Sequence, residues 1–485
     1  MSAPRLRPAP LPLGPLAVVG LACLLAAWPS AARAGGPLGA EDSRIRTSRY
    51  AIDFYSGQVV SASRVIGLAG SFSAIAEGVD AVPINPAAAA VRVPWSYHWF
   101  DYDLTLGISF PTAILGSDVE NLGLRAAEYR YDGYYVPSIG LLGSFGRTGI
   151  GLTVEDRRYS LTSSTSQTPS SGADRYAASL YSVHAVVARS VWRGQLTFGV
   201  GLRLVGFSLI DESTKATRLA MTGISAETGV LVAPTDSHFR LGLVGRLPVS
   251  ARPQADSELK PNADGDLVAP GDFYFPQSVE VPWEAELSLA VELGERPLNP
   301  RWENPDEYTR PLRAELSRAR EIRAARHATQ AEEDQARLDE RQQLEAHEAD
   351  LTERRRYAHQ HSPRTRKLLT ATVLLTGPVS EAVAPVSLLR QTVTRSGQGI
   401  TVTPRLGLEV EPIENWVQMR LGLYLEPGRA AQANARLHFT TGFDVKLFPW
   451  SVFGLYHDST WWSVGAVVDV ADRYNNVAFR VGVWR

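Results

Sequence analysis

The strongest constraint in this chain is a two-residue period that recurs in segment after segment. Between Arg436 and Leu447, apolar side chains stand at every second position except Thr441, and polar or charged side chains dominate the positions between them. The segments Ile400 to Glu411 and Ser278 to Leu293 follow the same rule. Because successive side chains of a strand point to opposite faces, each segment is expected to be a β-strand with one apolar and one polar face.

Two kinds of β-protein contain such strands. In a soluble sandwich the apolar face forms the core, whereas in a transmembrane barrel it meets lipid and the polar face lines the lumen. Periodicity alone leaves both open. Long strands, glycines on the polar face and aromatic residues near segment ends favour the barrel. The aromatic residues at segment ends are Trp95, Tyr97, Trp99, Trp192, Trp283, Trp416, Trp462 and Trp484.

We therefore predict an all-β fold, a transmembrane antiparallel β-barrel of about 14 strands, the even number that single-chain bacterial barrels have. The candidate strands are 95–110, 134–145, 148–159, 177–191, 195–209, 219–232, 237–248, 278–293, 367–376, 400–411, 416–425, 435–447, 460–470 and 477–484. Short and long connections alternate, as expected for periplasmic turns and outer loops. With the N-terminal segment in the periplasm, the first strand would run outward.

The N-terminal 34 residues have the regions of a secretory signal peptide. Arg5 and Arg7 precede an apolar run from Leu16 to Trp28, and a small-residue motif ends at Ala34. The run is too short for a spanning helix, and no uncharged apolar run of 18 residues follows it. The only cysteine, Cys23, lies within this segment, so we expect no disulfide and no thiolate metal site in the mature chain.

The remaining chain divides into a segment 35–94 before the barrel, strands 1–8 over 95–293, an insertion over 294–366 and strands 9–14 over 367–485. The insertion is dense in Arg, Glu, Ala and Gln from Asp306 to His361, which predicts long charged helices. Strand parity places it in the periplasm. Two interpretations stay open for it: a solvated helical insertion or an arm that binds a periplasmic protein.

The usual signatures of catalysis, metal binding and phosphate binding are missing, so we expect neither an enzyme nor a cofactor nor a metal. A net charge of −2 gives no field that would attract nucleic acid. The candidate functional residues are instead the charged side chains predicted to face the lumen. They are Arg203, Glu280, Glu284, Glu286, Arg405, Glu409, Arg420, Arg436, Asp444 and Lys446. Such charges either line a solute path or pair with one another in a plugged interior.

The stretch from Val65 to Val91, VIGLAGSFSAIAEGVDAVPINPAAAAV, is rich in small residues and breaks at Asn85-Pro86. It resembles the N-terminal segment of the FadL-type outer-membrane transporters of long-chain fatty acids and other hydrophobic compounds, with a glycine-rich start and an Asn-Pro-Ala signature before the first strand. PorV-like barrels, which serve protein secretion, share this pattern. The resemblance implies a fourteen-stranded barrel with an N-terminal hatch, and Gly67, Gly70, Asn85 and Pro86 as hatch or gate residues.

Some features depart from the family pattern. Glu77-Gly78 stands where the family has an acidic pair, the charged helical insertion is not a standard feature, and the last strand ends in Arg485 rather than an aromatic residue. These departures bear on the substrate more than on the barrel.

We therefore expect a bacterial outer-membrane barrel in contact with membrane lipids, acting as a passive channel for a hydrophobic small-molecule ligand such as a long-chain fatty acid. The alternative is a non-transporting barrel that acts as an adaptor or scaffold for secretion or envelope partners through its helical insertion.

Overall fold

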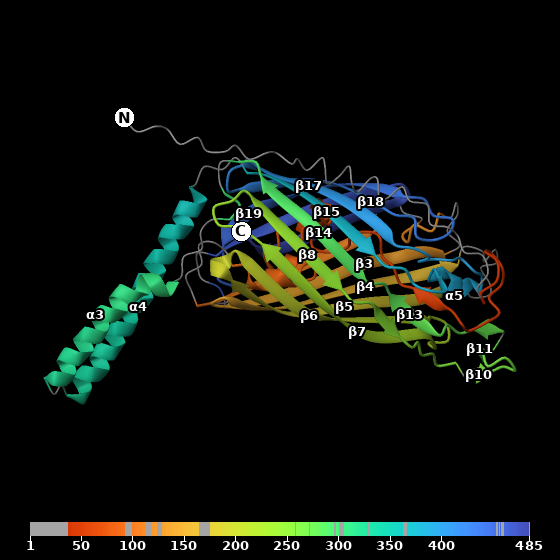
Figure 1. The fold of residues 1–485 in the computed structure, drawn as a ribbon, viewed down its shortest axis with the longest axis horizontal. Coiled ribbons are helices and arrows are strands. Elements are labelled where there is room, and N and C mark those ends of the chain that lie inside the picture. The colour runs from red at the N-terminus through yellow and green to blue at the C-terminus, as the bar shows by residue number, and fades with distance from the viewer. Residues whose placement is uncertain are drawn as a thin grey trace.

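The computed structural model describes the chain apart from 1–36, 93–98, 113–117, 124–128, 164–174, 258, 271, 295–296, 300–304, 327–328, 362–365, 453, 455, 457–459 and 485. The predicted signal peptide, Trp95 and Tyr97 lie outside the described residues. Within them, the dominant element is a closed barrel of 14 antiparallel strands, which confirms the predicted fold (Figure 1).

Each barrel strand is hydrogen-bonded to two neighbours, and β2 closes the ring by pairing with β21. The barrel strands are β2 (Phe100–Pro111), β3 (Tyr129–Phe145), β4 (Thr148–Ser163), β5 (Arg175–Val191), β6 (Leu196–Asp211), β7 (Thr217–Val232), β8 (Phe239–Arg246), β14 (Glu284–Glu292), β15 (Lys367–Thr376), β17 (Thr401–Ile413), β18 (Val417–Glu426), β19 (Arg436–Pro449), β20 (Trp461–Ala471) and β21 (Tyr474–Val483). Because the ring is closed, no barrel strand is left with an unpaired edge.

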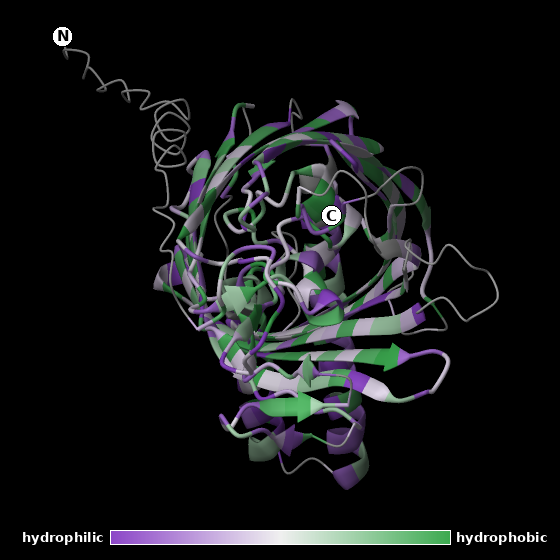
Figure 2. Cartoon of the chain, turned by 90° about the vertical axis from the view of Figure 1, so that its right-hand side faces the viewer, coloured by the Kyte–Doolittle hydropathy of each residue, from purple (hydrophilic) through white to green (hydrophobic). Residues whose placement is uncertain are grey.

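The alternation along each strand is apolar outside and polar inside. On β19, Leu437 and Phe439 are 44% and 61% exposed, whereas Arg436 and His438 between them are buried. Bands of both colours alternate along the strands in Figure 2. An outer face built from exposed leucine, valine and phenylalanine is unstable in water but suits the hydrocarbon of a bilayer. This observation excludes the sandwich and makes the chain a transmembrane β-barrel.

The two ends of the barrel differ. Tight connections at Gly146-Arg147, Trp192–Gly194 and 414–416 lie at one end, together with the C-terminus, and we call it the short-turn end. The opposite end, the long-loop end, carries the connections 247–283 and 377–400. The smaller elements of these connections are β9 (Val249–Ala251), β10 (Lys260–Pro261), β11 (Leu267–Ala269), β12 (Phe273–Tyr274), β13 (Ser278–Val281), β16 (Ala382–Val383), α5 (Val386–Arg390) and the 3₁₀ turn η3 (Trp192–Gly194).

Two long helices, α3 (Pro305–Ala325) and α4 (Gln330–Gln360), form a hairpin at the short-turn end (Figure 1). Thr329 caps α4 in a capping box with Glu332. The two helices are joined by a buried Glu340, whose carboxylate pairs with Arg320 and Arg323 of α3. Within the described residues, no helix is both long and apolar enough to cross a membrane.

Candidate functional site

The chain before the first barrel strand passes through the lumen. The first strand, β1 (Ala51–Asp53), pairs in parallel with β13 and β16, both of which belong to long-loop connections. From there the chain runs through α2 (Ser63–Gly67), η1 (Val79–Ala81) and η2 (Pro86–Ala90) before β2 begins at the short-turn end. Within the segment, α2 contacts β18 to β21 and η2 contacts β4 to β7 on another part of the ring, so the segment lies inside the barrel. The described part of the segment therefore starts at the long-loop end and reaches the short-turn end where β2 begins.

Residues 62–90 form the part of this segment that we call the hatch. Almost all of its side chains are buried, including Phe72, Ile75 and Ala87 to Ala90. Small side chains let its backbone turn repeatedly within the narrow lumen, and apolar ones supply burial without the need for hydrogen bonds. The hatch therefore packs as a core inside the barrel.

Gly67 and Gly70 lie where the hatch meets β17 and β18. The Gly67 carbonyl accepts a hydrogen bond from Thr440 Oγ1 at 3.1 Å, and a Cβ at Gly67 would lie 3.2 Å from Arg420. Gly70 has a φ of +74°, and its carbonyl accepts a hydrogen bond from Arg405. A side chain at Gly70 would be strained by the backbone and would also crowd the Arg405 guanidinium.

Asn85 and Pro86 start η2. Asn85 is fully buried, its Oδ1 accepts a hydrogen bond from the Ala87 amide at 3.0 Å, and its Nδ2 donates to the Ser73 carbonyl at 2.8 Å. Asn85 thus caps the turn and ties two parts of the hatch together, while Pro86 occupies the first helical position, where no amide hydrogen is needed.

The barrel wall is shaped to receive η2. A Cβ at Gly199 of β6 would overlap the carbonyl of Pro86, and a Cβ at Gly149 of β4 would overlap the carbonyl of Ala89. These wall positions can hold only glycine while η2 stays in place. The close approach of η2 explains why Gly149 and Gly199 stand on the polar faces of β4 and β6.

The predicted lumen charges on β17 to β19 are paired with the hatch and with one another. Glu409 is fully buried and accepts from Arg64 of the hatch at 3.0 Å and from Arg420 at 2.6 Å. Arg420 also pairs with Asp444 at 2.8 Å. Glu77 of the hatch pairs with Arg240 of β8 at 2.8 Å.

Two further lumen residues stand at opposite ends of the same wall. Arg436 pairs with Glu426 at 2.6 Å near the long-loop end. Lys446 lies near the short-turn end, with its ammonium 4.2 Å from the ring centroid of Trp461. On this side of the lumen, the plugged-interior alternative describes the structure.

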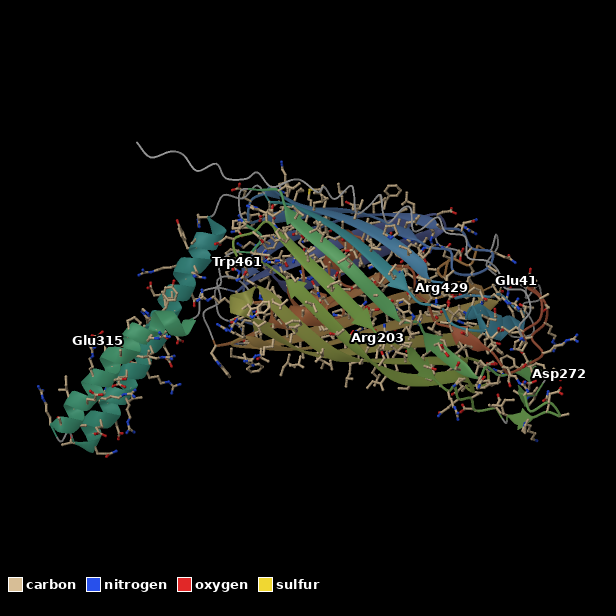
Figure 3. The ribbon with its side chains drawn as sticks, in the orientation of Figure 1. Glu41, Arg203, Asp272, Glu315, Arg429 and Trp461 are labelled. Atoms are coloured by element: carbon tan, nitrogen blue, oxygen red, sulfur yellow. The ribbon has the colours of Figure 1, made fainter. Side chains whose placement is uncertain are left out.

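The opposite side of the lumen keeps open space. A polar cavity of about 210 Å³ lies between the hatch and β4, β5, β6, β14 and β17. Its lining includes four of the predicted lumen residues, Arg203, Glu284, Glu286 and Arg405. Arg203 lies 3.8 Å from Glu284, which Arg246 binds at 3.0 Å. The placement of Arg203 within the barrel is seen in Figure 3.

Glu280 is the predicted lumen residue that the structure places elsewhere. It belongs to β13, which pairs with β1 and β9 outside the barrel wall, and its carboxylate accepts from Ser278. The apolar and polar alternation continues from Ser278 to Leu293, but Pro282 has no amide hydrogen and interrupts the ladder. The barrel strand β14 consequently begins at Glu284.

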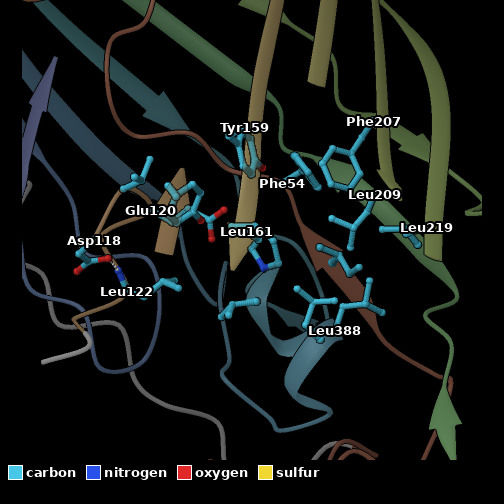
Figure 4. Close-up of a pocket in the computed structure, with 16 residues that line it drawn as sticks. Phe54, Asp118, Glu120, Leu122, Tyr159, Leu161, Phe207, Leu209, Leu219 and Leu388 are labelled. Atoms are coloured by element: carbon cyan, nitrogen blue, oxygen red, sulfur yellow. Dashed lines mark hydrogen bonds between the residues drawn. The ribbon is translucent and has the colours of Figure 1, made fainter. Parts of the chain in front are cut away.

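A second, apolar cavity lies at the long-loop end and was missed from the sequence. It has a volume of about 50 Å³ and lies between the N-terminal segment, β4, β6, β7 and α5 (Figure 4). Its lining includes Phe54, Leu161, Phe207, Leu209 and Leu388. Phe207, Leu209 and Leu219 lie within strands predicted from the sequence, and Leu161 lies just beyond one. Their partners come from distant loops whose positions no local pattern reveals.

One side chain of this apolar cavity is chemically distinctive. Glu120, in the connection between β2 and β3, points its carboxyl group into the cavity near Tyr159 (Figure 4). Burial raises the pKa of Glu120 to about 7; a hydrogen bond from Tyr131 opposes this rise, and the neighbouring Asp118 adds to it. A carboxyl group near half protonation at neutral pH can act as a hydrogen-bond donor or acceptor.

A third cavity, of about 100 Å³, opens at the short-turn end around Val91, Arg147 and Arg193. Residues of the polar cavity, Pro83 and Ile84, precede η2 in the chain, whereas the third cavity is lined by the last residue of η2, Ala90, and by Val91 after it. The hatch thus lies between the two cavities. Phe54 lines both the apolar and the polar cavity, so these two are neighbours.

Comparison with known proteins gives structural similarity only. No family model and no curated protein matches the sequence. The crystal structure of a Pseudomonas aeruginosa FadL homologue is similar, with a TM-score of 0.47 and 11% identity over 88% of this chain and 98% of that chain. The Pseudomonas putida toluene transporter TodX has a TM-score of 0.46 and 10% identity, covering 88% and 98%. The CymD monoaromatic hydrocarbon channel has a TM-score of 0.43 and 10% identity, covering 87% and 96%.

Proposed function

We propose that this chain is a bacterial outer-membrane barrel that acts as a passive channel for hydrophobic small molecules, with the hatch as its gate. The observation that carries the proposal is the apolar cavity at the long-loop end, which adjoins the polar cavity inside the barrel lumen. A lining of aliphatic and aromatic side chains with a few polar groups is typical of sites for small apolar ligands.

The order of the three cavities supports a route. An apolar molecule leaves water at the apolar cavity and reaches the polar cavity past Phe54. The hatch separates that cavity from the short-turn end, so passage along the barrel requires the hatch to be displaced. In this proposal the long-loop end faces outward, and the short-turn end with its helical hairpin faces the periplasm.

The substrate class is tested by uptake. Cells that express the protein should take up labelled toluene, hexadecane or a long-chain fatty acid such as oleate several-fold faster than cells with an empty vector. A variant with a filled cavity, Leu388→Trp, should return uptake to the vector level while its barrel stays folded. Equal uptake of all three compounds with and without the protein would refute the channel.

An adaptor function remains the second candidate, because the hairpin of α3 and α4 extends away from the barrel (Figure 1). Its surface carries exposed apolar side chains, Ile322 and Leu338. A periplasmic protein partner should be recovered by cross-linking from wild-type envelopes and lost when the hairpin is deleted. Recovery of the same proteins after that deletion would count against the adaptor.

A further inference from the structure

The apolar cavity has one polar atom without a partner. The Oε2 atom of Glu120 is buried and makes no hydrogen bond within the described residues. An unpaired polar atom in an apolar setting costs about 1–3 kcal/mol. A ligand that bonded this atom would remove that cost.

Two other polar side chains of the cavity, Asp118 and Tyr131, are already engaged. Asp118 accepts from the amides of Leu122 at 2.8 Å and Gly123 at 3.0 Å, and it lies 3.6 Å from Arg473. The Tyr131 hydroxyl hydrogen-bonds the Glu120 carboxyl group. Glu120 is therefore the group that can recognise a polar part of a ligand.

The lining also determines the charge that a ligand can carry. Among the described residues that line this cavity there is no lysine and no arginine, and the two charged side chains are both acidic, Asp118 and Glu120. A carboxylate ligand, such as a fatty-acid anion, would meet like charge in an apolar setting and find no cation to pair with. The cavity is therefore suited to neutral molecules.

We propose that the apolar cavity selects neutral hydrophobic molecules that carry one hydroxyl group, the class of alkylphenols and aliphatic alcohols, and that Glu120 is the residue that recognises the hydroxyl. An ionised carboxylate accepts the ligand's hydroxyl hydrogen, and a protonated carboxyl group donates to the hydroxyl oxygen, so a hydroxyl satisfies Oε2 in either state. The apolar body of the ligand then contacts Phe54, Leu209 and Leu388. This inference rests on the proposed channel function and names its preferred ligand.

The proposal is tested by equilibrium binding to the purified full chain in detergent. The probes are p-cresol, p-xylene, 4-methylanisole and oleate; the first two have nearly the same shape and differ in a hydroxyl against a methyl group. Glu120→Leu should weaken p-cresol binding at least tenfold and leave p-xylene binding equal or stronger. Glu120→Gln, which keeps a donor and an acceptor, should retain p-cresol binding.

The wild-type protein alone provides a second test, should the Leu variant not fold. Wild type should bind p-cresol more tightly than 4-methylanisole, whose ether oxygen cannot donate, and more tightly than oleate. Unchanged p-cresol binding in Glu120→Leu, or tighter binding of 4-methylanisole or oleate than of p-cresol, would overturn the assignment of Glu120 while leaving a hydrophobic-compound channel intact. Failure of every probe to bind wild type would overturn the channel and this inference together.

Discussion

At the scale of single residues, the hatch is held by buried ion pairs whose partners come from both sides of the lumen. Glu77 lies 2.8 Å from Arg240 and 3.4 Å from Arg64, and Arg64 also binds Glu409. Removal of one member of such a network leaves buried charges without partners, which costs about 3–5 kcal/mol. The hatch should therefore be sensitive to single changes at these positions.

Glu77→Ala is expected to loosen the hatch without unfolding the barrel. Hydrogen exchange of the amides in 62–90 should become faster by at least tenfold, and planar-bilayer recordings should show a leak that wild type lacks. The matched control is Glu345→Ala, which removes an exposed helix pair with Arg341 that is worth about 0–1 kcal/mol. Unchanged exchange in the Glu77 variant would show that the network does not hold the hatch.

The raised pKa of Glu120 predicts a pH-dependent affinity for purely apolar ligands. Above its pKa of about 7 the carboxyl group ionises, and its charge faces the same cavity as Asp118, Tyr131 and Tyr159. Binding of p-xylene should therefore weaken about tenfold between pH 6 and pH 8, because an apolar ligand excludes water from the carboxylate. Glu120→Gln should bind p-xylene equally at both values. A wild-type affinity that does not change with pH would contradict the placement of this carboxyl group.

At the scale of elements, η2 fits against the barrel wall because its backbone can come close to glycines of the wall strands. A Cβ at Gly199 would overlap the backbone of Pro86, whereas a Cβ at Gly245 would meet its nearest neighbour at 3.6 Å. Gly199→Ala should displace η2 and increase proteolysis or hydrogen exchange of the hatch, and Gly245→Ala should behave as wild type. Equal behaviour of the two variants would mean that η2 does not seal against β6.

The elements also show what could be predicted from the sequence. Strands facing lipid on one side and the lumen on the other alternate strictly, so β17 and β19 could be recognised from their own residues. Glu280 was misplaced because the alternation continues through Pro282, across the boundary between two sheets. The apolar cavity could not be predicted, since Phe54, Glu120 and Leu388 meet only through the packing of separate loops.

At the scale of the whole molecule, the barrel and the helical hairpin are separable. Glu292 ends β14 and Lys367 begins β15, and the two residues are neighbours in the barrel wall. The Lys367 amide donates a hydrogen bond to Glu292 Oε1 at 2.8 Å. A short Gly-Ser linker in place of 305–361 removes both helices and keeps Leu298 and Asn299, which bind Arg240. This variant should keep the heat-dependent gel mobility of a folded barrel and the uptake of wild type; loss of the folded band would show that the hairpin is needed for assembly.

In the proposed channel, the closed hatch lies in the path of the ligand. Ser71 Oγ of the hatch and Thr372 Oγ1 of β15 lie 2.8 Å apart, and the only cysteine of the chain is in the predicted signal peptide. The pair Ser71→Cys and Thr372→Cys should therefore form a disulfide that fixes the hatch to the wall.

The most direct measurement is uptake of labelled toluene or p-cresol by cells that carry this double variant, with and without a reductant. If the hatch is the gate, uptake should stay at the vector level while the disulfide is intact and should return to near the wild-type level after reduction. Both single-cysteine variants should show wild-type uptake with and without the reductant. Full uptake through the oxidised protein would contradict the hatch as the gate.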